Sequence, residues 1–176
     1  MATIRSEAVA TRLPNLTETT ATRPVALAAV EGARPDLGRA MSLHVSKLRG
    51  ISVETRAKLK RQGVTYTHQL LLAAGHLADR VQFVARSNID EGNLSRLVHR
   101  ADLARVKGVG AIFADMLEVL EVDTVARLAA QEPEALHRRL YELNSVERFA
   151  RRAPTPEEVQ DWVSQARSLP LLLDDD

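Results

Sequence analysis

The sequence predicts an all-α protein, and three observations support this fold class. Hydrophobic residues make up 45% of the 176 residues but aromatic residues only 3%, so the core must consist mainly of Leu, Val, Ile and Ala. Apolar residues recur at three- and four-residue spacings from about residue 50 onward, which is typical of amphipathic helices. The chain also has only eight glycines. This composition favours helices over a sheet.

The first 40 residues differ from the rest of the chain. They are rich in Ala, Thr, Arg and Pro and show no clear periodicity, which predicts a flexible N-terminal arm over residues 1–40. They lack the continuous apolar segment of a secretory signal, and no run in the chain approaches the roughly 18 apolar residues that span a bilayer. Cysteine is absent. We therefore expect a cytoplasmic protein without a membrane partner, with a folded domain over residues 41–169 and a short acidic tail over 170–176.

Helical spacing predicts six helices in addition to those that flank two glycine-containing turns. They are expected at residues 66–74, 76–86 and 91–104 in the first half and at 123–130, 133–143 and 156–168 in the second. The last helix has the clearest start, because Thr155 is a good N-cap, Pro156 suits the first turn and two glutamates follow.

A tight turn is expected at Gly108, Val109 and Gly110. The helical apolar pattern stops there and resumes at once, and two glycines around one apolar residue allow positive φ and the close approach of another group. The unit of helix, turn and helix resembles the helix-hairpin-helix motif, in which an alanine follows the second glycine four residues later; here it is Ala114. Lys107 stands before the first glycine, where many versions of the motif have proline.

The first half contains a degenerate copy of the same turn. Shifting the sequence by 58 residues places Gly50 over Gly108 and Val64 over Val122. This correspondence predicts two repeats, at about residues 41–98 and 99–168. A helix pair cannot bury its apolar faces alone, so we expect the repeats to pack as one compact domain with a shared core.

The two turns and the closing helix together resemble an uncharacterised bacterial family, a domain of unknown function with tandem helix-hairpin-helix motifs, over about residues 41–169. The resemblance implies a fold related to the small helical hairpin domains of DNA repair proteins and polymerase accessory domains. It implies no activity, and fold analogy alone does not define a function.

Charge is divided unevenly between the halves. Lys and Arg outnumber Asp and Glu 12 to 5 in residues 41–110, whereas the ratio is 7 to 14 in residues 111–176. A glycine turn that leads into a helix presents backbone N–H groups and the positive end of the helix dipole, which suits phosphate, and nearby cations add counterion release. We therefore predict non-enzymatic, sequence-independent binding to the nucleic-acid backbone, of DNA in preference to RNA. The predicted contact residues are Lys47, Arg49, Gly50, Lys58, Lys60 and Arg61 in the first half and Lys107, Gly108 and Gly110 in the second.

Other interpretations stay open at this stage. The glycines can serve only to let two helices cross closely, with Ala114 as the small contact residue. The basic half can face an acidic protein, as in an adaptor, or the acidic half of another copy, as in a self-associating scaffold. The C-terminal leucines can pack back on the domain, but SLPLLLDDD also resembles the short peptides by which bacterial replication factors dock into the sliding clamp. Residues 165–176 are therefore a second candidate partner site.

No catalytic, metal or cofactor site is predicted. The five histidines are scattered and never form an i, i+4 pair around a glutamate, no Gly-rich phosphate loop with Lys-Ser or Lys-Thr occurs, and no serine lies in a nucleophile elbow. Trp162 is expected in the core. Tyr66 and Tyr141 have no aromatic neighbours in sequence, so we expect no stacking platform for single-stranded nucleic acid.

Overall fold

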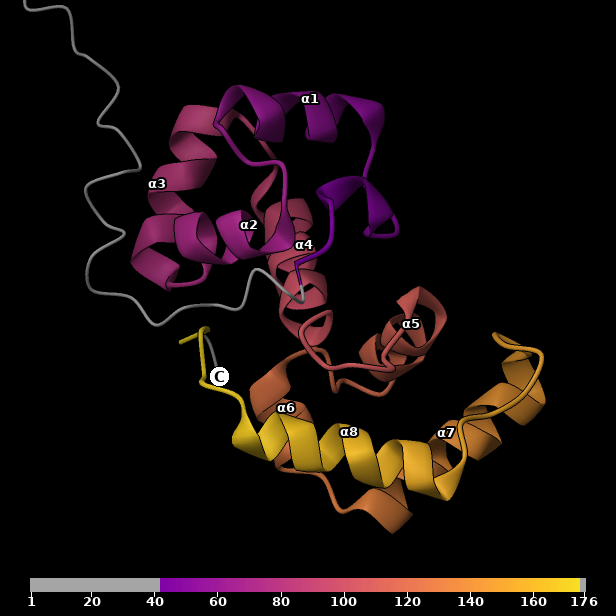
Figure 1. The fold of residues 1–176 in the computed structure, drawn as a ribbon. Coiled ribbons are helices and arrows are strands. Elements are labelled where there is room, and N and C mark those ends of the chain that lie inside the picture. Colours follow the sequence, from indigo (N-terminus) through magenta and orange to yellow (C-terminus); the bar gives the residue numbers. More distant parts are fainter. Residues whose placement is uncertain (1–41, 175–176) are drawn as a thin grey trace, which may run out of the picture. The chain divides into compact units, whose positions relative to one another are not determined.

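The computed structural model describes residues 42–174, all of which belong to one compact unit that spans Asp36–Asp176. The arm predicted at residues 1–40 lies outside the described residues. Within them the chain forms eight α-helices and a short 3-10 helix and no strand, which confirms the all-α fold class (Figure 1). The elements are η3 (Val45–Lys47), α1 (Val53–Arg61), α2 (Thr67–Ala74), α3 (Leu77–Ser87), α4 (Glu91–Leu103), α5 (Ala111–Val119), α6 (Val125–Ala129), α7 (Pro133–Glu147) and α8 (Pro156–Ser168).

The helices begin and end close to the residues that spacing predicts. The start of α8 is a capping box, in which the Thr155 side chain accepts from the Glu158 backbone N–H at 3.3 Å and the Glu158 carboxylate accepts from the Thr155 N–H at 2.8 Å. The largest difference is at α7, which continues to Glu147 instead of ending at residue 143. It ends at Arg148, whose φ of 53° is left-handed and stops the helix.

Backbone features recur at an offset of 58 residues. α1 and α5 are both nine residues long, and each begins three residues after a glycine in the left-handed region. Each ends in a turn with a second left-handed residue, after which a buried valine donates its N–H to a leucine carbonyl 2.9 Å away. The matched pairs are Gly50 and Gly108 (φ 74° and 95°), Gly63 and Glu121 (φ 79° and 59°), and Val64 and Val122.

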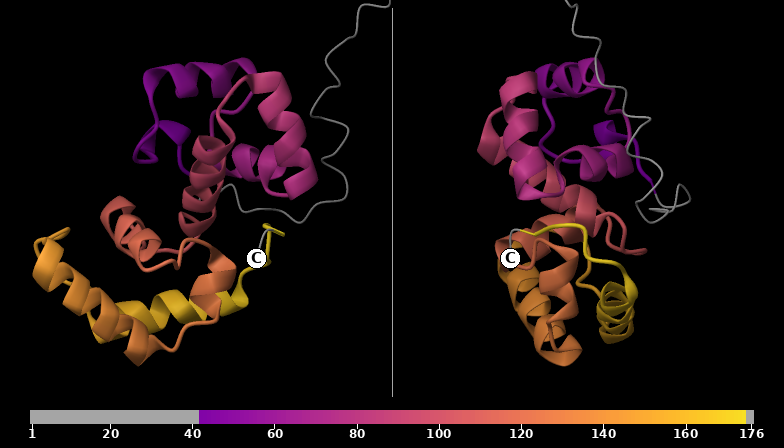
Figure 2. Two further views of the ribbon diagram at one scale, coloured as in Figure 1. Left: turned by 180° about the vertical axis from the view of Figure 1, so that it is seen from behind. Right: turned by 90° about the vertical axis from the view of Figure 1, so that its left-hand side faces the viewer.

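The buried side chains form two clusters, not the single shared core that the repeat predicts. The first cluster lies among η3 and α1 to α4, and the second among α5 to α8. Helix α4 contributes to both, because Val98 and Ala101 belong to the first cluster and Leu103, near the end of the helix, belongs to the second. Figures 1 and 2 show α4 between the two groups of helices. Each half has enough helices to cover its own apolar faces, so each builds its own core.

The C-terminal tail packs back on the domain, as the simplest interpretation of its leucines predicts. Leu169 contacts the second cluster, whereas Leu172 and Leu173 contact the first. Beyond them, the Asp174 carboxylate accepts a hydrogen bond from the Leu77 backbone N–H at 2.7 Å, at the start of α3. The tail therefore connects the two halves.

Candidate nucleic-acid interface

At the first glycine of the Gly-Val-Gly turn, which is itself exposed, an added side chain would point at helix α8. A Cβ at Gly108 would lie 2.8 Å from Nε1 of Trp162, a side chain that is buried in the second core and contacts Phe113 with ring centroids 5.1 Å apart. One turn further along α8, the Gln165 side chain accepts from the Lys107 backbone N–H at 2.9 Å and donates to the Lys107 carbonyl at 3.0 Å. Gly108 therefore allows the turn to pack closely against Trp162 of α8.

The second glycine of the turn is open. Gly110 is the N-cap of α5, has an ordinary φ of −77°, and has no atom within 4 Å of the position of an added Cβ. No side chain caps α5 and its first turn contains no acidic residue. The first N–H groups of a helix have no acceptors within the helix, so the N–H groups of Ala111, Ile112 and Phe113 are available to an outside acceptor, whereas the Ala114 N–H already donates to the Gly110 carbonyl at 2.9 Å.

A shallow groove brings the start of α5 next to the η3 segment of the first half. Its lining includes Leu43, Lys47 and Arg49 on one side and Gly110, Ala111 and Asp115 on the other. Lys47 is exposed, and its side chain forms no ion pair or hydrogen bond within residues 42–174. Residues that are about 60 positions apart in sequence thus form one surface, with a free ammonium group opposite an uncapped helix.

An ion-pair network crosses between the halves beside this groove. Arg49 pairs with Asp115, and Arg100 pairs with Asp115 at 3.4 Å and with Glu118 at 2.7 Å. Arg100 also donates to the Arg49 carbonyl, close to Gly50, where a Cβ would lie 3.1 Å from the guanidinium. Arg49 and Gly50 therefore help to join the halves, and the two acidic side chains that follow the glycine turn are neutralised.

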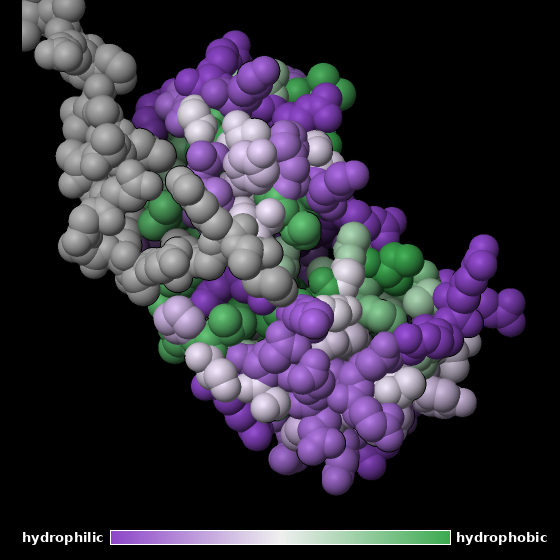
Figure 3. Space-filling view, viewed as in Figure 1, coloured by the Kyte–Doolittle hydropathy of each residue, from purple (hydrophilic) through white to green (hydrophobic). Residues whose placement is uncertain are grey.

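Helix α1 carries both engaged and free cations. The Lys58 ammonium lies 2.8 Å from the Glu54 carboxylate and donates to the Asn88 carbonyl at 2.7 Å. This ammonium lowers the pKa of the Glu54 carboxyl from its usual value, mainly through its hydrogen bond. Lys60 and Arg61 are exposed and form no ion pair or side-chain hydrogen bond within the described part of the chain. In Figure 3 the surface over α1 is mostly hydrophilic.

The structure thus separates the nine predicted contact residues by the contacts they make. Four have charged groups available to a ligand: Lys47, Lys60, Arg61 and Lys107. Gly110 leaves open space at the start of α5, but its own N–H donates to the Gly108 carbonyl at 3.0 Å and its carbonyl accepts the Ala114 N–H at 2.9 Å. Four make internal contacts: Arg49, Gly50, Lys58 and Gly108. The prediction omits Arg56, an exposed α1 cation without an ion pair among residues 42–174, although its i, i+4 spacing from Lys60 places both on one helix face.

No group of three or more His, Cys, Asp or Glu side chains among residues 42–174 is arranged to hold a metal ion. None of the helices in this range has the length and apolar character needed to cross a membrane.

A comparison with known protein families identifies the family of the chain's folded part. The family model described as a domain of unknown function (DUF4332) matches residues 49–169, which include both turns and end one residue after α8. No curated protein and no solved structure matches the chain.

Proposed function

The chain belongs to the DUF4332 family of domains of unknown function, and we propose that it binds the phosphate backbone of nucleic acids, DNA in preference to RNA, without reading base sequence. Its two turns would then act as tandem helix-hairpin-helix motifs. The recurrence of left-handed residues and nine-residue helices at a 58-residue offset supports this motif assignment. The proposal includes no catalytic step.

The groove between η3 and α5 is the observation that carries the proposal. Lys47 and Ala111, the first residue of the uncapped helix α5, line the same groove. A helix start offers aligned N–H groups and partial positive charge, and an ammonium group adds a full charge, so the two together suit a phosphate. Lys107, exposed and immediately before the turn, adds a second ammonium group on the α5 side.

The acidic side chains near this site are held in ion pairs, so their repulsion of a phosphate group is reduced. Asp115 and Glu118 would repel phosphate if they were unpaired, but Arg49 and Arg100 form ion pairs with them. The free cations of α1 extend the basic surface beyond the groove. Backbone contacts of this type release counterions and give weak, salt-dependent binding with a Kd of roughly 1–100 µM at physiological salt.

A salt titration tests the proposal. Binding of a fluorescently labelled 20-base-pair duplex would be measured by anisotropy between 30 and 200 mM KCl, with a double-stranded RNA of the same sequence in parallel. We expect log Kd to depend linearly on log salt concentration, with little effect of base composition. Lys47→Ala and Lys60→Ala should each reduce the slope by about one, because each removes one phosphate contact.

Arg138→Ala is the matched control. Arg138 is an exposed cation on α7 without an ion pair among residues 42–174, and it lies outside the proposed surface. Its removal should leave the slope unchanged. The proposal is wrong if the wild-type protein at tens of micromolar binds neither the duplexes nor a single-stranded DNA or RNA in 30 mM KCl, or if Arg138→Ala reduces the slope as much as Lys47→Ala.

An adaptor that uses residues 165–176 remains the alternative. In the structure this segment is engaged, because Gln165 holds the glycine turn and Leu173 lies in the first core. The tail would have to leave the domain to dock as a peptide. Retention of a partner protein after nuclease treatment, and its loss on deletion of residues 170–176, would favour the adaptor.

A further inference from the structure

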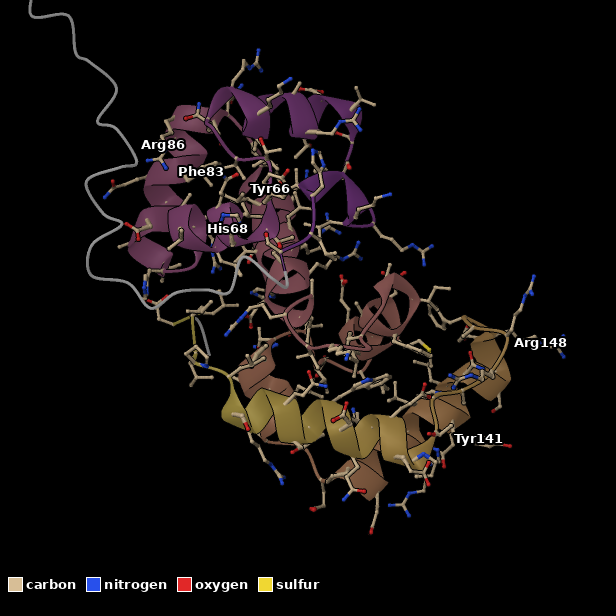
Figure 4. All side chains as sticks on the ribbon, viewed as in Figure 1. Tyr66, His68, Phe83, Arg86, Tyr141 and Arg148 are labelled. Atoms are coloured by element: carbon tan, nitrogen blue, oxygen red, sulfur yellow. The ribbon has the colours of Figure 1, made fainter. Side chains whose placement is uncertain are left out.

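Three rings that are separated in sequence meet on the surface of the first half. The centroids of His44 and Tyr66 are 5.6 Å apart, with the rings nearly perpendicular, and those of Tyr66 and His68 are 6.0 Å apart, with the planes only 23° from parallel. Tyr66 is 44% exposed and His44 is also exposed. Figure 4 shows Tyr66 and His68 near the start of α2.

The backbone holds these rings in place. An isolated antiparallel bridge pairs His44 with Tyr66, with the Val45 N–H donating to the Thr65 carbonyl at 2.9 Å and the Thr67 N–H donating to the Leu43 carbonyl at 2.8 Å. Ring positions that are set in advance lose little entropy when a ligand binds.

The side chain of His68 is also oriented, because its Nδ1 lies 2.6 Å from the Ser42 hydroxyl. Packing of the first core does not require the Tyr66 ring, since Tyr66 is absent from that cluster. The ring cluster of His44, Tyr66 and His68 is therefore an ordered aromatic surface, exposed at His44 and Tyr66 and half-buried at His68. His44 also caps η3, because its Nδ1 accepts from the Ser46 N–H at 3.2 Å, whereas the Tyr66 ring has no such role.

This cluster adjoins the proposed phosphate groove. His44 lies between Leu43 and Lys47, both of which line that groove, and its carbonyl accepts the Lys47 backbone N–H at 2.8 Å. We propose that the ring cluster stacks unpaired bases of a single-stranded nucleic acid whose phosphates contact Lys47 and the start of α5. This inference rests on the proposed function, and it adds the class of nucleic acid that the site prefers.

The physical argument is the match between ring faces and unpaired bases. Aromatic side chains, histidine included, stack on bases that are splayed out of a helix. Such stacking tolerates any sequence because every base has a π-face. In a duplex the base faces are covered by their neighbours, so the cluster has nothing to stack on. The cluster should therefore strengthen single-strand binding and leave duplex binding unchanged.

The test uses three probes with the full-length protein at 50 mM KCl: a labelled (dT)12, a 12-nucleotide abasic chain with the same phosphates, and a 12-base-pair duplex. The wild-type protein should bind (dT)12 more tightly than the abasic chain. Tyr66→Ala should weaken (dT)12 binding by about 5- to 30-fold, the lower part of the range for loss of one stacked base. It should not change binding of the abasic chain or the duplex. Tyr66→Phe keeps the ring and should restore (dT)12 binding.

Tyr141→Ala is the matched control. Tyr141 is a second exposed tyrosine, with its ring centroid 6.4 Å from that of His137, but it lies on α7, well apart from Tyr66 and His68 (Figure 4), and does not line the groove. Its removal should not affect binding of (dT)12. Thermal unfolding of each variant would show that the fold is retained.

The outcomes separate this inference from the proposed function. Equal affinity of the wild-type protein for (dT)12 and the abasic chain, or an equal loss for both with Tyr66→Ala, overturns stacking but leaves phosphate binding in place. Failure to bind any of the three probes overturns the proposed function and the inference with it. Binding of (dT)12 alone, with loss in Tyr66→Ala and recovery in Tyr66→Phe, supports stacking and overturns duplex binding.

Discussion

The same substitution at the two glycines of the Gly-Val-Gly turn should have a large effect on stability at Gly108 and a small one at Gly110. Gly108→Ala introduces a Cβ at φ 95° and 2.8 Å from Trp162 Nε1, whereas Gly110→Ala introduces one at φ −77° with no atom within 4 Å. The first substitution should therefore destabilise the protein strongly. The second should change the free energy of unfolding by no more than about 1 kcal/mol, because its backbone conformation is open to any residue.

The magnitude for Gly108→Ala has two parts. A left-handed backbone costs an L-residue roughly 1–2 kcal/mol, and forcing extra atoms into a packed core typically costs about 1–3 kcal/mol. Trp162 cannot move away easily, because it is only 1% exposed and packs against Phe113. The expected total is about 2–5 kcal/mol, which corresponds to a fall of roughly 5–15 °C in Tm for a chain of this length.

Urea denaturation is the assay, with the fluorescence of Trp162 as the probe. It is the only tryptophan in the sequence and lies in the second core, so its signal reports on the half that contains the turn. In a Trp162→Phe background, followed by far-UV circular dichroism, the steric part of the Gly108→Ala cost should shrink and the backbone part should remain.

Equal stability of Gly108→Ala and the wild-type protein would refute the close packing inferred for this turn. A cost that is the same in both Trp162 backgrounds would refute the assigned contact while leaving the backbone strain. The pair also matters for function: lost nucleic-acid binding in Gly108→Ala would report unfolding, whereas Gly110→Ala retains the fold and tests the groove itself.

Three further predictions each concern a single residue. The hydrogen bond from Arg152 is the main cause that lowers the pKa of Glu158 to about 2. The ionised carboxylate therefore stabilises the fold fully above about pH 4.5, and this stabilisation is lost as the pH falls toward 2. Glu158→Gln should flatten the dependence of the free energy of unfolding on pH in that window, and an unchanged dependence in urea titrations would exclude the contact. Leu173→Ala should lower the free energy of unfolding by about 2 kcal/mol and reduce hydrogen-exchange protection of α2, because Leu173 lies in the first core. Unchanged protection would mean that the tail is free to dock elsewhere. Glu121 has a left-handed φ of 59° at the position where the first repeat has Gly63. Glu121→Gly should therefore stabilise the fold by about 1 kcal/mol and raise Tm, because glycine adopts this conformation without strain. A lower Tm would show that the Glu121 side chain has another role.

The sequence by itself determined the local structure. Helix positions followed from three- and four-residue spacing, and the start of α8 from Thr155, Pro156 and the glutamates, because caps and amphipathic faces depend on residues within one or two turns of each other. The offset of 58 residues was also visible from Gly50 and Gly108, since left-handed backbone positions favour glycine. The all-α class follows from the same local signals.

Only the tertiary structure decided which groups are available and how many cores exist. Sequence places Lys58 and Lys60 in one basic cluster, yet the Asn88 carbonyl, 30 positions away, engages the first and not the second. Trp162 decides the role of Gly108 across 54 positions, and the bridge between His44 and Tyr66 assembles the ring cluster that sequence neighbours did not indicate. Such contacts depend on how helices pack against each other, and packing is set by the combined shape of many side chains from distant segments, which no local pattern encodes.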